Sequence, residues 1–241
     1  MKKLLSLAMI LAICIPAANA ASVMRKTVKA CGTSITEIRK TGHFRNIVSC
    51  CGIRVLVYVS DKCGVEIEAD KNIAPYLITE VNDNTLMLYY DDDVNIKNNG
   101  STTVKVYCSE LEEIRTTSGS TISFETPFSG RNITIAATSA SSVRGEINYG
   151  NCNVLTTSGA EVRLRGQCDT YTVASTSGSS VNLGRLAGRN VEATATSGAT
   201  VSVYATESVT AAASSGATIL YYGSPRNTNI TKSSGGRVTA K

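Results

Sequence analysis

The chain has 241 residues, 42% of them hydrophobic, with no Trp and only three Phe, so Val, Ile, Leu and small residues must build its core. Its formal charge is +5, and it falls to +3 once Lys2 and Lys3 are set aside as part of a leader. Such a small net charge does not indicate a polyanion partner, and we expect no nucleic-acid partner.

Residues 1–20 read as a signal peptide. Lys2 and Lys3 form a positive start, residues 4–16 are mostly apolar, and Ala18-Asn19-Ala20 is an A-x-A cleavage site before Ala21. The apolar run is too short to span a bilayer and no later run is longer, so we expect no transmembrane segment. The leader predicts an exported protein in the periplasm, at the outer-membrane surface or outside the cell.

Residues 21–110 are predicted to be a β-rich N-terminal half. Apolar residues alternate along residues 53–59, so Ile53, Val55, Val57 and Val59 should share one face of a strand. Residues 71–84 could hold one helical turn before an Asp-Asn turn. We expect this half to continue into the segment that follows and to seal it; a separate domain ending near Ser109 is the alternative.

Seven cysteines remain after the leader. In an exported protein they favour disulfides, but an odd number leaves one thiol over and the pairing stays open. His43 is the only histidine and no CxxC spacing occurs, so no metal cluster and no cofactor are expected. The seven are Cys31, Cys50, Cys51, Cys63, Cys108, Cys152 and Cys168.

Residues 111–241 repeat a Thr-Ser-Gly motif at a period near nineteen, which predicts an array of stacked units. We number each unit from its Gly as zero; Ala140 takes that place in one unit. The residues that we expect to form the corners are Ser118, Gly119, Ser139, Ala140, Ser158, Gly159, Ser177, Gly178, Ser197, Gly198, Ser215, Gly216, Ser234 and Gly235.

Apolar residues occupy odd positions on both sides of this Gly, while most even positions are polar. At +3, every unit has Val or Ile, as in Val162, Val181 and Val201. Alternation with period two around a Gly indicates two short strands that meet at a tight corner. Stacked units of this kind predict an all-β, single-stranded parallel β-helix of about seven coils with a β-rich N-terminal cap.

The order "GHFRNIVSCCGIRVLVYVSDKCGVEIEADKNIAPYLITEVNDNTLMLYY", followed by recurring TSG coils, resembles the head GIN-domain family. Members of that family are exported and labelled "putative auto-transporter adhesin". The resemblance covers nearly the whole mature chain and implies a right-handed β-helix, consistent with the handedness of parallel crossovers. It carries no catalytic motif and implies no catalytic residue.

Two acidic groups are candidates for chemistry. Glu125 and Glu146 share position +6 on neighbouring units, and the coil spacing could place them about 5 Å apart, as in a retaining glycosidase. Arg165 follows at +6 on the next unit and should neutralise one of them. Asp91, Asp92 and Asp93 offer oxygen ligands for Ca²⁺, but an acidic surface turn is the simpler interpretation.

A column of hydroxyls at −2 is the candidate ligand-binding face. It could hydrogen-bond a glycan or a regular surface, although a solvated Thr face would look the same. Two aromatic residues near the C-terminus could add a platform. The residues concerned are Thr138, Thr157, Thr176, Thr196, Tyr221 and Tyr222.

We therefore expect a non-enzymatic cell-envelope protein that presents a rigid surface to a glycan, a host surface or an envelope component. The sequence leaves its oligomeric state open. A binder of lipid or a small apolar ligand, in a cleft between the N-terminal half and the first coils, is the alternative. A polysaccharide-active β-helix enzyme is a second alternative, disfavoured because no acid–base constellation is visible.

Overall fold

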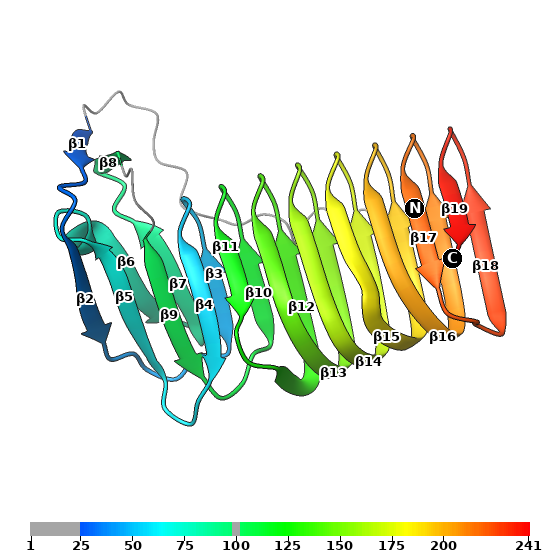
Figure 1. Cartoon of the computed structure of the whole chain (residues 1–241), viewed down its shortest axis with the longest axis horizontal. Helices are drawn as coiled ribbons and strands as arrows, with labels where there is room; N and C mark the ends of the chain where they lie inside the picture. Colours follow the sequence, from blue (N-terminus) through cyan, green and yellow to red (C-terminus); the bar gives the residue numbers. More distant parts are fainter. Residues whose placement is uncertain (1–24, 98–101) are drawn as a thin grey trace.

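The structure is a computed structural model that describes residues 25–97 and 102–241 (Figure 1). The expected leader, residues 1–20, lies outside the described residues. Seventeen strands join one sheet that winds along the long axis of the molecule. Two others, β1 (Lys26–Lys29) and β8 (Val94–Lys97), form a separate parallel pair. Within the described ranges, no helix is long and apolar enough to cross a membrane.

The predicted parallel β-helix is confirmed for the TSG repeats. Each corner joins two strands, and the strands of successive units pair in parallel, so that Val162 is in register with Val143 and Val181. The corners form a row of tips along one edge of the rod (Figure 1). The strands of this part are β10 (Glu113–Thr116), β11 (Thr121–Phe124), β12 (Phe128–Ala137), β13 (Ser142–Thr156), β14 (Glu161–Ser175), β15 (Ser180–Ala195), β16 (Thr200–Ala213), β17 (Thr218–Tyr222), β18 (Asn227–Lys232) and β19 (Arg237–Ala240).

Like stacks on like inside the rod because parallel pairing keeps equivalent positions in register. The column at +3 is buried along its whole length, at 0–6% exposure. Each buried methylene contributes about 0.8 kcal/mol, so the column stabilises the rod coil by coil. In spatial order, from the N-terminal cap to the C-terminus, it contains Val104, Val55, Ile122, Val143, Val162, Val181, Val201, Ile219 and Val238.

Every corner is a tight turn with two left-handed residues. The Ser at −1 has φ between 47° and 56°, and the residue at zero has φ between 59° and 77°. The N–H at +1 donates to the carbonyl at −2, as from Ser120 to Thr117 at 3.2 Å. These features define a type I′ turn, which needs positive φ at both central positions. The sequence predicts backbone freedom at the Gly alone; the structure shows that the Ser is left-handed too.

Corners also hydrogen-bond to one another. The N–H of Gly159 donates to the carbonyl of Ser177 at 3.1 Å, and the N–H of Gly178 donates to Ser197 at 3.0 Å. The same bond recurs at every junction from Gly52 to Gly216. The ladder of the sheet therefore continues through the turns, and the row of tips is as ordered as the strands beside it.

The N-terminal half adds two more levels to the rod, and they lie out of chain order. The pair β3 (Asn46–Ser49) and β4 (Arg54–Val59) lies directly on β10 and β11. On its other side lie β7 (Thr85–Tyr90) and β9 (Thr103–Cys108), also parallel to it. Residues 50–52, Cys-Cys-Gly, take the place of Thr-Ser-Gly, with Cys51 and Gly52 at φ 66° and 74°.

Antiparallel strands cover the N-terminal end. β5 (Gly64–Asp70) pairs with β9, and β2 (Ser34–Arg39) pairs with β5. β6 (Leu77–Asn82) pairs with β7 through a turn at Asp83 and Asn84, and the expected helical turn is the 3-10 helix η1 (Ala74–Tyr76). One expectation is wrong: Val59 is 46% exposed, whereas Ile53, Val55 and Val57 are fully buried. It is the last residue of β4 and has left the core.

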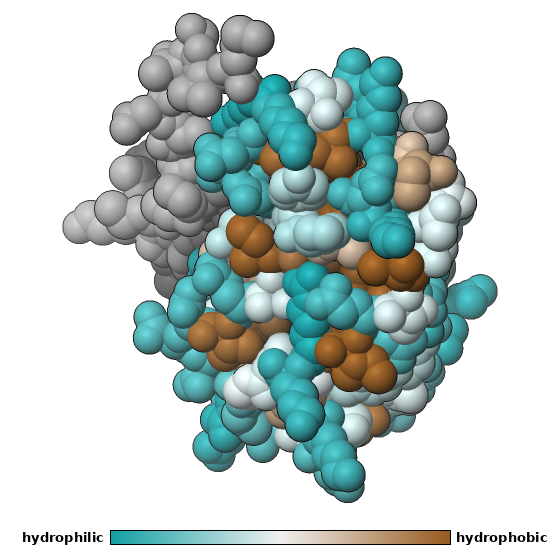
Figure 2. Space-filling view, turned by 90° about the vertical axis from the view of Figure 1, so that its left-hand side faces the viewer, coloured by the Kyte–Doolittle hydropathy of each residue, from teal (hydrophilic) through white to brown (hydrophobic). Residues whose placement is uncertain are grey.

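The surface of this capped end is mixed. In Figure 2, which views the molecule from that end, hydrophobic residues form separate islands among hydrophilic ones. Ile38, on the outermost strand β2, is 78% exposed. Scattered apolar residues of this kind are normal on a soluble surface, so the end view shows no continuous apolar face.

Two substitutions at position zero of the corners should change the free energy of unfolding in opposite directions. Gly159→Ala should lower the free energy of unfolding by about 1 kcal/mol, because Ala disfavours left-handed φ. No atom lies within 4 Å of a Cβ added there, so the cost is one of backbone conformation alone. Ala140→Gly, at φ 59°, should raise the stability by a comparable amount. Urea unfolding of both variants measures this, and equal midpoints would contradict the type I′ corner.

Candidate functional site

The first candidate surface is the row of corners, which we call the corner ridge: the hydroxyl residues at −2 and −1. The Ser at −1 is exposed, while Thr157, Thr176 and Thr196 at −2 are half-buried. In the five corners that have Thr at −2, its Oγ1 lies 3.4–3.5 Å from the Oγ of the following Ser. The ridge therefore presents paired hydroxyls that repeat at the coil spacing of about 4.8 Å.

Small buried residues behind the corners hold the ridge in place. The Oγ1 of Thr156 lies 2.9 Å from the Oγ of Ser175 and 3.1 Å from that of Ser179. Ser179 Oγ donates to the carbonyl of Thr176 at 2.6 Å. These hydroxyls satisfy one another where the two strands converge and no large side chain fits. The corners are thus supported from within.

The two tyrosines do not form one platform. Tyr221 packs against the core, whereas Tyr222 lies outside, where a Cβ on Gly184 would approach its ring to 3.1 Å. Consecutive residues of a strand point to opposite faces, so adjacency in the sequence keeps these two side chains apart. Both tyrosines are half-buried, and they lie at the end of β17 that is remote from the corner ridge.

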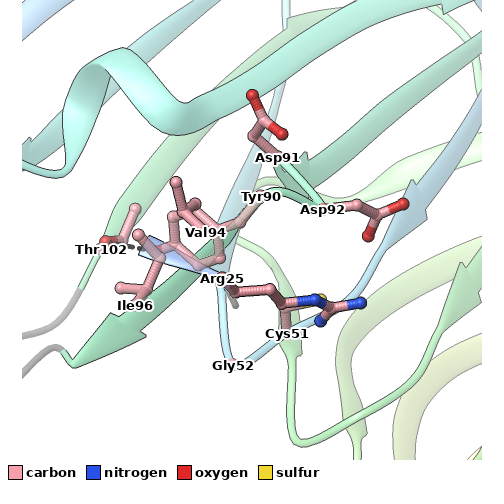
Figure 3. A pocket seen from close by; sticks show the side chains of 9 residues that line it. All are labelled: Arg25, Cys51, Gly52, Tyr90, Asp91, Asp92, Val94, Ile96 and Thr102. Atoms are coloured by element: carbon pink, nitrogen blue, oxygen red, sulfur yellow. Dashed lines mark hydrogen bonds between the residues drawn. The ribbon is translucent and has the colours of Figure 1, made fainter. Parts of the chain in front are cut away.

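A second candidate is a pocket of about 390 Å³ beside the Cys-Cys-Gly corner (Figure 3). It contains the acidic turn, but Asp91 and Asp92 point away from each other. Asp91 Oδ1 accepts the N–H of Asp93 at 2.9 Å, a bond typical of a turn. In the described part of the chain, no three potential metal ligands gather. The lining residues are Arg25, Cys51, Gly52, Tyr90, Asp91, Asp92, Val94, Ile96 and Thr102.

The thiols of this corner are close neighbours. Cys50 Sγ and Cys51 Sγ lie 2.6 Å apart, with Cys50 buried and Cys51 exposed. Their hydrogen bond lowers the pKa of Cys51 to about 7 and raises the pKa of Cys50. All seven described cysteines are free thiols in the structure, so it contains none of the expected disulfides.

A second thiol pair lies inside the rod. A hydrogen bond between Cys152 and Cys168 raises the pKa of Cys152 and lowers that of Cys168. Both residues are buried, and they lie at neighbouring levels, since Cys168 is in register with Tyr149 and Cys152 with Tyr171. This pair spans the bend between two coils.

The third candidate is a groove of about 510 Å³ on the strands that leave the corners, which we call the arginine groove. Phe124 and Leu164 form its floor, and Gly145 lies between them at the same column position. A Cβ on Gly145 would lie 2.5 Å from the Cβ of Phe124, so only Gly lets the Phe124 side chain pack there. The lining residues are Ser123, Phe124, Glu125, Arg144, Gly145, Arg163, Leu164, Arg165, Asn182 and Arg185.

Four arginines surround this groove, and they form two pairs of like-charged neighbours on adjacent strands. Arg144 is in register with Arg163, and Arg165 is in register with Arg185. Like charges directly opposite one another on paired strands are destabilising. Arg165 Nε pairs with Glu146 at 3.0 Å, as its column position predicts, and Arg163 pairs with a neighbouring glutamate.

Neither the arginine groove nor the Cys-Cys-Gly corner was expected from the sequence. The sequence contains a pattern that could have indicated part of each feature. For the groove, Arg144 and Arg163 share position +4. For the corner, Gly52 has Ile47 at −5 and Val55 at +3, as the TSG units do. Arg185 could not be found this way, because the register between β14 and β15 shifts at Arg163 and Arg165. That shift brings Arg185 beside Arg165.

Several solved structures share this fold. A solved "putative adhesin" of Bacteroides fragilis matches with TM-score 0.85 and 22% identity over 89% of this chain and 100% of its own. A "putative lipid binding protein" of Parabacteroides distasonis matches with TM-score 0.73 and 19% identity, over 90% and 100%. A "putative adhesin" of Parabacteroides merdae matches with TM-score 0.69 and 18% identity, over 90% and 99%. At these identities the likeness shows the fold alone.

No curated protein matches the chain. A family model does match, over residues 43–225, and its description is "Putative auto-transporter adhesin, head GIN domain". That range holds both the levels contributed by the N-terminal half and most of the TSG coils, well over half of the chain. The chain belongs to the head GIN-domain family.

Proposed function

We propose that the protein is exported to the cell envelope and acts without catalysis, as an adhesin that presents a rigid β-helical surface. The corner ridge is the observation that carries this proposal. Its hydroxyls repeat at a fixed spacing on turns that hydrogen-bond to one another, so a glycan or another regular surface would meet a preorganised array. The family description and the names of two structural neighbours agree with this function.

The alternatives have less support. Arg165 neutralises Glu146, so Glu125 and Glu146 do not form the free carboxylate pair that a glycosidase would use. The pocket beside Cys51 has an apolar wall of Val94 and Ile96, but charged side chains also line it. A lipid-binding cleft would be mainly apolar. The lipid-binding label belongs to the Parabacteroides distasonis neighbour.

Charge on the corner ridge should abolish adhesion. Replacing Thr157, Thr176 and Thr196 together with Glu should reduce adhesion to host cells, and binding on a glycan array, at least tenfold. The reason is that three like charges at coil spacing repel one another and displace the hydroxyls. A matched variant with Glu at Thr172, Thr194 and Thr210, which lie on the strands rather than at the corners, should adhere like the wild type. Equal adhesion by all three proteins would remove the ridge as the contact face.

Export has its own test. Protein recovered from the envelope of cells that express the full chain should begin at Ala21, because the A-x-A site ends at Ala20. Mass spectrometry of the N-terminal peptide measures this. An intact Met1 on cytoplasmic protein would contradict export.

In the exported protein, we expect Cys152 and Cys168 to form a disulfide. The two thiols would pass two electrons to a thiol–disulfide exchange partner of the oxidising compartment and release two protons. Closing a loop of this size contributes about 3 kcal/mol, so a reducing agent should lower the free energy of unfolding by that amount. Cys152→Ser should remove the effect of the reducing agent, whereas Cys31→Ser, at an exposed site, should leave it. Peptide mapping that finds both thiols alkylated in exported protein would overturn the pairing.

A further inference from the structure

We propose that the arginine groove binds the acid groups of an extended acidic polysaccharide, carried as carboxylates or sulfates. This inference goes beyond adhesion by the corner ridge, because it concerns another surface and names a ligand chemistry. It rests on three features of the groove: two arginines without an ion-pair partner, a fixed spacing between the arginines and an apolar floor.

The positive charge of the groove is only partly neutralised by ion pairs within the chain. Among the ion pairs of the described residues, none includes Arg144 or Arg185. The Nε of Arg144 instead donates to Ser123 Oγ at 3.2 Å, which leaves the outer nitrogens of its guanidinium free. Arg163 and Arg165 are paired, but their side chains remain 63% and 66% exposed. Each can therefore still take a second acidic partner at its outer edge.

The spacing suits a chain of acid groups. In-register residues on adjacent strands are about 4.8 Å apart, so the four guanidinium groups start from backbone positions on three successive coils. Guanidinium groups donate paired hydrogen bonds that match carboxylate and sulfate oxygens. An anion between two in-register arginines would also reduce their mutual repulsion, which the ion pairs of Arg163 and Arg165 relieve for only one arginine of each pair.

The walls and floor favour a sugar over a nucleic acid. Phe124 is only 6% exposed, so it offers no ring on which a base could stack. Glu125 and Asn182 line the groove and can bond sugar hydroxyls. The groove volume of about 510 Å³ gives a sugar ring room between the arginines. Polar groups together with a small apolar floor are the usual surroundings of a bound ligand.

The experiment uses the mature chain and defined polymers. Binding of polygalacturonate, dextran sulfate, neutral dextran and an oligothymidylate is measured by calorimetry for the wild type and for the double variant Arg144→Gln/Arg185→Gln. The control Arg131→Gln/Arg226→Gln removes the same charge from exposed arginines outside the groove that also form no ion pair. Thermal unfolding of both variants shows that each is folded.

We expect the wild type to bind an acidic polymer and not neutral dextran, with preference for polygalacturonate or dextran sulfate identifying the acid group. A charge-assisted hydrogen bond contributes enough that each lost arginine should weaken binding about tenfold. The control should bind within about twofold of the wild type. Equal weakening in both variants would show that binding depends on net charge alone, and that the arginine groove is not the binding site. If an oligothymidylate binds more tightly than either acidic polymer, the ligand is not a polysaccharide and the proposal is wrong. The proposal is also wrong if neither acidic polymer binds.

Discussion

In-register parallel pairing is the constraint on which the rest of the structure depends. Each coil adds its strands to the coil before it, and the type I′ corners extend the hydrogen-bonded ladder through the turns. A side chain at one position of one coil therefore meets its equivalents on the coils above and below. Core columns, the corner ridge and the arginine groove all follow from this single rule. It explains why a small change in register, as between Arg163 and Arg165, creates a new surface feature.

The N-terminal half shows how such a rod is sealed. Its two levels enter out of chain order, because β3 and β4 lie between β10–β11 and β7–β9. Antiparallel β2, β5 and β6 then replace the next coil, so the buried columns end against a cap. At the other end, β18 and β19 are exposed apart from Val238 and Ile230, and carry Lys232 and Arg237. Charged residues on a terminal strand disfavour pairing with another chain.

Local charge and total charge lead to different expectations for this protein. The mild net charge does not indicate an acidic partner, yet four arginines gather beside one groove while most glutamates pair elsewhere on the surface. Lys105, for example, is bound by Glu66 and Glu68 from the capping strand β5. A binding field depends on how charges are distributed and not only on their sum.

Sequence alone determined the fold class and the core columns, because a period near nineteen with alternating Val, Ile and Ser has one stable stacked arrangement. Column counting also predicted that Arg165 would neutralise one of Glu125 and Glu146, and the structure shows that its partner is Glu146. Only the tertiary structure decided the order of the levels, the left-handed Ser at each corner and the separation of Tyr221 from Tyr222. It alone placed Arg185 beside Arg165 and packed Phe124 against Gly145. Register shifts and non-sequential pairing depend on contacts between residues far apart in the chain, which a local repeat does not encode.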